Sequence, residues 1–239
     1  MAESVWSIAG RRVPVGASVH YLLHEYPALT LRHYDFGGES PRDSITMADL
    51  GRATLFGAFR GWKTAAALLR AAEAATWPAE KETWRLDAAP DADPENWLAR
   101  PEVRAARDLF ASLASGAEGG WREAAASKVL HLKWPSFFPV IDGELRRLYG
   151  HRALEAERRI PGSRRRTQAS TTAYWIVVRQ DLLKSENRQA DMATRAALAS
   201  AADSEKAALL VQLSNLRLLD VLAWGIASKD LMAEAEPSA

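Results

Sequence analysis

Apolar residues at helical spacing are the feature that most limits what this chain can fold into. The longest pattern predicts one leucine-rich core helix over residues 204–229. A second stripe follows the i, i+3, i+4, i+7 rule at Val19, Leu22, Leu23 and Tyr26. No stretch alternates apolar and polar residues for long enough to predict a sheet. The sequence therefore predicts an all-α protein.

Start and stop signals divide the rest of the chain into shorter helices. Thr46 followed by Asp49 predicts a capping box and a helix from about residue 47 to 59. Asp93 before Pro94 predicts another helix start, with an interruption near Pro101. Further helices are expected at about 62–75, 143–149, 169–185 and 188–201.

Three segments lack a helical pattern. We expect an irregular lead-in over residues 1–15 and a turn-rich loop over residues 31–41. Residues 78–95 are polar and rich in Pro and Asp, as in a surface connection. We therefore expect a single two-lobed helical domain over residues 1–239, with a candidate lobe boundary at about 78–95.

Composition excludes several kinds of site. The 239 residues contain no cysteine, which excludes disulfides, thiolate metal sites and iron–sulfur clusters. The five histidines lack the spacing of a metal site, so we expect no metal and no cofactor. No signal peptide and no apolar run of about 20 residues is seen, so we expect a cytoplasmic monomer without membrane contact. The formal net charge is +1, so nucleic-acid binding would depend on local patches.

A Gly-rich turn opens the stretch that carries most of the chemistry, residues 119–142. Gly119 and Gly120 precede a short helix, and backbone N–H groups at such a turn bind phosphate well. Lys128 would add positive charge one to two turns further on. The alternative is a helix connection that merely needs glycine.

Asp142 ends the same stretch, directly after an apolar Pro-Val-Ile segment. Asp is favoured as a helix N-cap, and a carboxylate at this point is also a candidate catalytic group. The two roles are compatible, because a capping carboxylate is held rigidly near the positive end of the helix dipole.

Two further charged segments are candidates for a functional role. Residues 158–168 form a basic loop in which Arg164, Arg165 and Arg166 are candidates for phosphate binding. A solvated loop without a ligand is the alternative. Arg217 and Asp220, spaced i, i+3, are expected to form a semi-buried ion pair unless Asp220 supports the site around Asp142.

Several segments resemble a known family. Residues 34–50, 126–135, 139–142 and 216–224 are similar to the DUF6308 family, and the resemblance spans most of the chain.

Residues 119–142 also resemble the helix-hairpin-helix DNA glycosylase superfamily (HhH-GPD), in which a Gly-rich hairpin enters a helix and a catalytic Asp follows. Gly120 matches the second hairpin glycine, Pro135 the loop proline and Asp142 the catalytic acid. Glu123 stands near the position of the lysine nucleophile of glycosylase/lyases, so the resemblance implies a monofunctional enzyme. Glu118 stands where the first hairpin glycine is expected.

The resemblance implies a two-lobed DNA glycosylase that flips a damaged or modified base, in DNA repair or antiphage defence. Asp142 would stabilise the positive charge that develops on the sugar. The base would lie among Tyr34, Asp35, Trp62 and Trp134.

Two other readings stay open. One is a non-enzymatic DNA-binding or interaction module with the same fold, which Glu118 and the modest net charge favour. The other is a small-molecule enzyme that uses Asp142 and a Trp-rich pocket.

Overall fold

Helices make up most of the protein, as predicted. The computed structural model describes residues 4–38, 41–59, 61–78, 84–116, 122–160, 168–201 and 204–235. The α-helices are α1 (Val15–His20), α2 (Ala28–Thr30), α3 (Met47–Leu55), α4 (Trp62–Ala74), α5 (Pro94–Leu98), α6 (Pro101–Gly116), α7 (Arg122–Lys133), α8 (Gly143–Glu157), α9 (Thr171–Leu183), α10 (Ser185–Ser200), α11 (Glu205–Val211) and α12 (Asn215–Ser228). Two π-helical turns, η1 (Tyr21–Glu25) and η2 (Leu31–Asp35), continue α1 and α2.

A small antiparallel sheet is present, although the sequence predicted no sheet and an irregular lead-in over residues 1–15. Strands β1 (Val5–Ile8), β2 (Arg11–Pro14) and β3 (Glu234–Ala235) pair in that order, so residues 5–14 form a β-hairpin and not an irregular lead-in. Ala9 and Gly10 turn the hairpin with φ values of 52° and 77°. The strands were missed because they are too short to show alternation and because β3 comes from the far end of the chain.

Helix ends follow their capping residues. Thr46 and Asp49 form the predicted capping box at the start of α3, and Asp93 caps α5 with Pro94 in its first turn. The single helix expected over residues 204–229 is wrong, because Ser214 breaks it and caps α12. The helix after Asp142 is longer than expected and reaches Glu157.

The loop expected over residues 31–41 is partly helical. Phe36 N–H donates to the Leu31 carbonyl at 3.2 Å, which closes the π-helical turn η2. This turn buries the Tyr34 side chain completely. It also directs Asp35 into the interior, where its side chain is 3% exposed.

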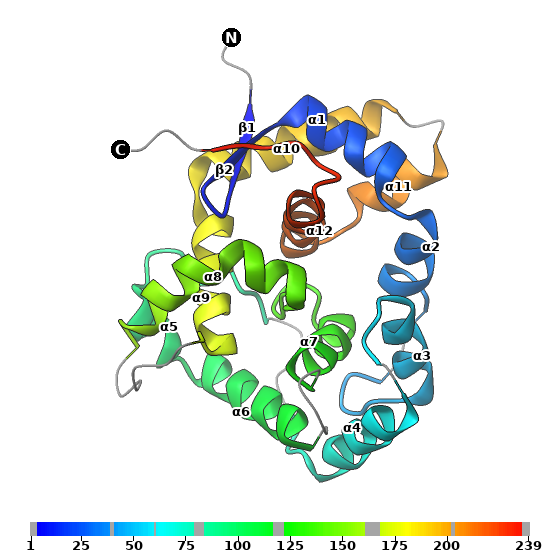
Figure 1. Cartoon of the computed structure of the whole chain (residues 1–239), viewed down its shortest axis with the longest axis vertical. Coiled ribbons are helices and arrows are strands. Elements are labelled where there is room, and N and C mark those ends of the chain that lie inside the picture. Colours follow the sequence, from blue (N-terminus) through cyan, green and yellow to red (C-terminus); the bar gives the residue numbers. More distant parts are fainter. Residues whose placement is uncertain are drawn as a thin grey trace.

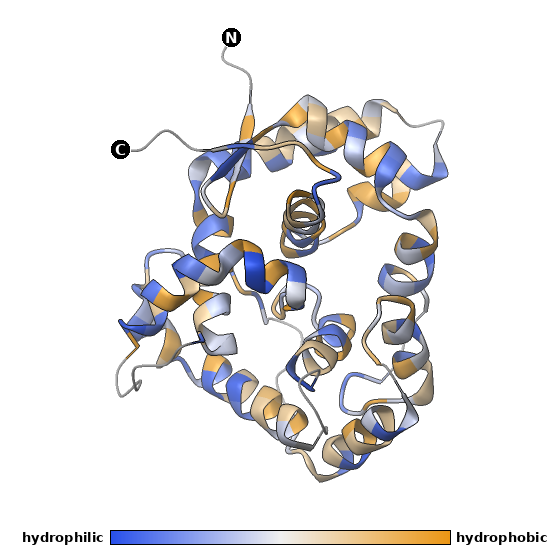
Figure 2. Cartoon of the chain, in the orientation of Figure 1, coloured by the Kyte–Doolittle hydropathy of each residue, from blue (hydrophilic) through white to orange (hydrophobic). Residues whose placement is uncertain are grey.

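The helices surround two central ones. Figure 1 shows α7 and α12 inside a surround that runs from α1 and α10 through α2, α3 and α4 to α6, and closes with α8 and α9. Helix α7 packs on α3 and α6, and α12 packs on α8 and α9. In Figure 2, α12 is hydrophobic over most of its turns, as expected of a helix buried on nearly every side. Among the described residues no single helix is long and apolar enough to cross a bilayer, and α11 and α12 meet that test only as a pair bent by 116°.

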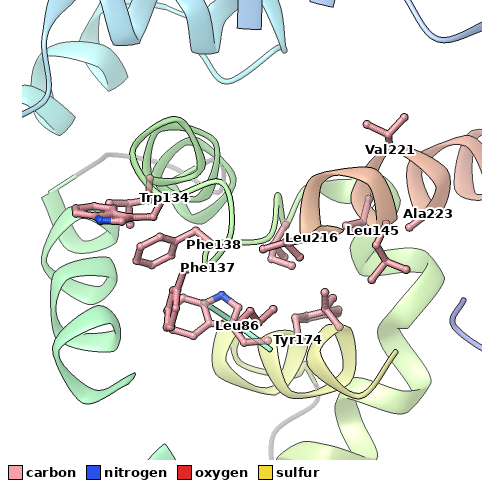
Figure 3. Close-up of a cluster of buried hydrophobic side chains, with 14 of the residues drawn as sticks. Leu86, Trp134, Phe137, Phe138, Leu145, Tyr174, Leu216, Val221 and Ala223 are labelled. Atoms are coloured by element: carbon pink, nitrogen blue, oxygen red, sulfur yellow. The ribbon is translucent and has the colours of Figure 1, made fainter. Parts of the chain in front are cut away.

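An aromatic cluster formed largely by residues of the loop that joins α7 to α8 fills the interior. Figure 3 shows Trp134, Phe137 and Phe138 packed together, with Leu86 and Tyr174 below them. Phe137 and Phe138 are fully buried, with ring centroids 5.0 Å apart. The buried residues before and after the predicted lobe boundary at about 78–95 belong to one continuous cluster.

Candidate functional site

Buried polar side chains hold the loop between α7 and α8 at three backbone groups. His131 Nδ1 lies 2.7 Å from the Phe138 carbonyl oxygen. Val140 N–H donates to Asp220 Oδ2 at 2.9 Å. Ile141 N–H donates to Ser127 Oγ at 3.1 Å. We call His131, Asp220 and Ser127 the loop clamp.

Asp142 lies directly after the clamped segment and caps α8. Its Oδ1 atom accepts from the N–H groups of Glu144 and Leu145, both at 3.1 Å. The other oxygen, Oδ2, lies 3.8 Å from Lys128 Nζ. The side chain is 12% exposed. The carboxylate is therefore fixed through one oxygen, while the other faces a cation.

Lys128 is buried, and this argues against the phosphate contact expected for it. Its side chain is 5% exposed, and Nζ donates to the Phe56 carbonyl oxygen at 2.7 Å. Burial lowers the pKa of Lys128, and the neighbouring Asp142 carboxylate opposes that shift. In this structure Lys128 balances Asp142 instead of facing solvent.

A buried network lies near Lys128, since Arg217 and Lys128 both lie against the Phe56 ring. Arg217 donates from Nε to Asp35 Oδ1 at 2.7 Å and from Nη2 to the Tyr26 hydroxyl at 2.8 Å. Tyr26 in turn donates to Asp35 Oδ2 at 3.0 Å. The Arg217 guanidinium lies 5.2 Å from the Tyr34 ring centroid, and the Tyr34 hydroxyl donates to the Lys128 carbonyl oxygen. The expected Arg217–Asp220 ion pair is therefore wrong, since Arg217 pairs with a residue on η2.

Burial sets the charge of two clamp residues. It lowers the pKa of His131 to about 3, and the nearby Arg217 cation adds to the shift. His131 is thus neutral, and its Nδ1–H donates to Phe138. Burial also raises the pKa of Asp220 to about 7, although the bond from Val140 N–H opposes the rise. Because His131 is neutral, it does not form an ion pair with Asp220, although Nδ1 and Oδ2 lie 4.0 Å apart. His131 Nε2 and Asp220 Oδ1 are buried without a hydrogen-bond partner in the described structure.

The four residues predicted to hold a base do not line one pocket. Tyr34 and Asp35 line a cavity of about 70 Å³ beside Arg217 and His131. Trp134 does not line that cavity; it is 3% exposed and its ring lies 5.3 Å from that of Trp84 in the core. Trp62, at the start of α4, is 63% exposed.

Most of the predicted phosphate contacts lie outside the described residues. This is the case for Gly119, Gly120, Arg164, Arg165 and Arg166. Within the described chain, no group of three or more His, Asp or Glu side chains is placed to hold a metal ion.

Glu123, which stands near the lyase lysine position, is in an ion pair with Arg146 of α8. Arg146 also reaches the Thr171 hydroxyl at 3.3 Å, so it ties the starts of α7 and α9 to α8. No sequence motif indicates this contact, because its residues lie on three different helices.

The fold and this site together define a mostly helical protein with a clamped carboxylate at the start of helix α8. Residues 15–227 match the model of the family of unknown function DUF6308, so the chain belongs to that family. The predicted membership is confirmed. Neither the curated proteins nor the solved structures gave a match. The resemblance to HhH-GPD glycosylases stays a prediction.

Proposed function

We propose that this protein is a monofunctional DNA N-glycosylase that hydrolyses the bond between a sugar and a flipped, damaged or modified base. DNA is the proposed partner, the protein acts as a monomer, and the activity belongs in the cytoplasm. Removal of damaged bases in repair and of modified bases in phage DNA are both served by this chemistry.

The geometry of Asp142 is the observation that carries the proposal. One oxygen is fixed by two N–H groups of α8, and the loop before it is held at three backbone groups. A carboxylate fixed in this way needs little reorganisation when positive charge develops nearby. A residue that only caps a helix does not require this support in the preceding loop.

The proposed reaction starts with cleavage of the N-glycosidic bond. The bonding electron pair leaves with the base, and positive charge develops on the sugar. The carboxylate of Asp142 stabilises that charge through Oδ2. A water molecule then adds to the sugar carbon C1′, and its proton passes to Asp142 or to solvent.

Lys128 has a supporting role in this scheme. Its ammonium group lies 3.8 Å from Asp142 and balances the carboxylate in the absence of DNA. The sugar cation would take over that balance as the bond breaks. Lys128 is too deeply buried to be the predicted phosphate contact, so phosphate binding is assigned to other residues.

One observation favours a second candidate, a DNA-binding module without catalysis. The hydrogen bonds from the N–H groups of Glu144 and Leu145 explain Asp142 as a helix cap. The nearby Lys128 ammonium group balances the negative charge of Asp142. A protein that kept the fold and lost the reaction would show the same contacts.

A base-release assay tests the proposal. DNA duplexes carrying uracil, oxidised, alkylated or phage-type modified bases would be incubated with the wild type and with Asp142→Asn, and abasic sites scored by alkaline cleavage. We expect release from at least one duplex by the wild type and none by the variant. DNA binding without release from any duplex would contradict the proposal and favour the second candidate.

A further inference from the structure

A groove with positively charged walls lies beside the N-terminal half of α8. It has a volume of about 480 Å³ and runs between the β1–β2 hairpin, α8 and the segment after α12. Arg11, Arg147 and Lys229 line it, and no carboxylate does among the residues that the structure describes. We propose that this groove binds the phosphate backbone of a DNA strand next to the target nucleotide, an inference that rests on the proposed function.

Charge complementarity is the first argument for an anionic strand. Arg11 and Lys229 are both exposed, and neither makes an ion pair with a described carboxylate. Arg147 is in contact with Glu144 of the same helix, with 63% of its side chain exposed. Arg11 and Lys229 can therefore contact phosphate oxygens, whereas Arg147 is held by Glu144 at the edge of the groove.

The groove floor is the second argument. Leu148, Ile226 and Leu231 line it, and the neighbouring Met232 is 81% exposed. A nucleic-acid strand presents phosphates on one side and the apolar faces of sugars and bases on the other. A groove with cations on its walls and aliphatic side chains on its floor matches both sides of such a strand.

Position along α8 places the groove close to the start of that helix, where Asp142 lies. Asp142 caps α8, and Arg147 and Leu148 follow five and six residues later. At 1.5 Å per residue this is about 8 Å along the helix. The groove therefore lies within two turns of Asp142 along α8.

The hairpin wall is fixed before any ligand binds. Ala9 N–H donates to Asp181 Oδ2 at 2.7 Å, and Asp181 also accepts from Arg152 at 2.8 Å. This anchor holds the turn that precedes Arg11 against α9. The cation on the hairpin is therefore presented from a rigid support.

Salt-dependent DNA binding by a charge-neutral double variant tests the inference. A fluorescent duplex of about 15 base pairs with a central abasic-site analogue would be titrated by anisotropy at several salt concentrations. For Arg11→Gln/Lys229→Gln we expect the slope of log Kd against log salt to fall by about 2, and Kd at about 0.1 M salt to rise about tenfold or more. Arg11→Lys should keep the wild-type slope.

Arg104→Gln/Arg188→Gln is the matched control, because it removes two exposed arginines on α6 and α10. It should bind as the wild type does. An equal loss in both double variants would overturn the inference, since general electrostatics would then explain binding.

An unchanged slope in the Arg11→Gln/Lys229→Gln variant would also overturn the inference. If that variant and the wild type both released bases in an Asp142-dependent reaction, the proposed function would still stand. A wild type that bound no DNA would overturn both.

Discussion

At the scale of single residues, Asp220 is a buried carboxyl group whose pKa is raised by its surroundings. It is buried on α12, accepts one hydrogen bond from Val140 N–H, and leaves its second oxygen unpartnered. Burial raises its pKa to about 7, far above the value of about 4 for an exposed Asp. The folded protein therefore takes up a proton here that the unfolded chain releases.

This difference predicts how stability depends on pH. A carboxyl group with a raised folded pKa favours the folded state at low pH, and that contribution is lost as pH rises from about 4 to about 7. Asp220→Asn keeps the acceptor for Val140 and has no charge to bury. We expect the variant to gain stability over the wild type across that range, on the order of 1.4 kcal/mol per pKa unit of difference.

Urea unfolding between pH 4 and pH 8 measures this effect. Asp230→Asn, at an exposed carboxylate near the end of α12, should show no such trend. If Asp220→Asn were less stable than the wild type at pH 8, ionised Asp220 would have to be paired in the fold, and its assigned state would be wrong.

Lys133 of α7 and Asp49 of α3 form another buried charge pair. Their side chains are 1% and 0% exposed, with Nζ and Oδ2 2.6 Å apart. Lys133→Met would leave the Asp49 carboxylate buried in the first turn of α3 without this cation. We expect a loss of about 3–5 kcal/mol in the free energy of unfolding, measured by urea titration.

Lys63→Met, at an exposed position on α4, is the control and should change stability by less than about 0.5 kcal/mol. A Lys133→Met variant as stable as the control would show that Asp49 is satisfied without its partner.

At the scale of elements, the hairpin turn depends on Gly10. Its φ of 77° lies in the left-handed region, and a Cβ there would meet no atom within 4 Å. Gly10→Ala should therefore destabilise only through backbone strain, by about 1–2 kcal/mol. Thermal unfolding of the variant measures the loss.

Gly51 is the matched comparison. It lies inside α3, where a Cβ would also meet nothing within 4 Å and where φ is helical. Gly51→Ala should stabilise the protein by about 1 kcal/mol. Equal effects at Gly10 and Gly51 would contradict the assigned turn.

Local signals in the sequence were enough to find several helix starts. Thr46 with Asp49, and Asp93 with Pro94, act within one turn and need no distant partner. Helix α7 was harder to interpret, because its buried face carries Lys128 and His131, residues that usually face water. Their burial depends on partners elsewhere in the chain.

At the scale of the whole molecule, the site is built from residues that are distant in sequence. Arg217 and Asp35 are 182 positions apart, and Asp220 reaches Val140 across 80. The spacing of residues along the chain does not reveal such pairs. The sequence could therefore identify Asp142 as a cap and a candidate acid, but not the clamp that holds it or the burial of Lys128.

Separation along the sequence also explains why the residues predicted to form a base pocket do not lie together in the structure. Trp134 was singled out for its residue type, yet it packs on Trp84 within the aromatic core. Tyr34 and Asp35 were placed in a loop, and the π-helical turn buries both beside Arg217. Residue type alone does not say which aromatic side chains reach a cavity.

The central claim is that Asp142 performs chemistry and does not only cap α8. Single-turnover base release by Asp142→Asn tests it most directly, because the Asn side chain still accepts the two N–H bonds and keeps the cap. Asp93→Asn, at the exposed cap of α5, is the matched control. We predict that Asp142→Asn folds with a lower melting temperature, because the buried Lys128 loses its counter-charge. At a temperature where the variant is folded we expect release to fall by about 10³-fold or more, while Asp93→Asn releases at the wild-type rate. Equal release rates for the wild type and Asp142→Asn would contradict the account.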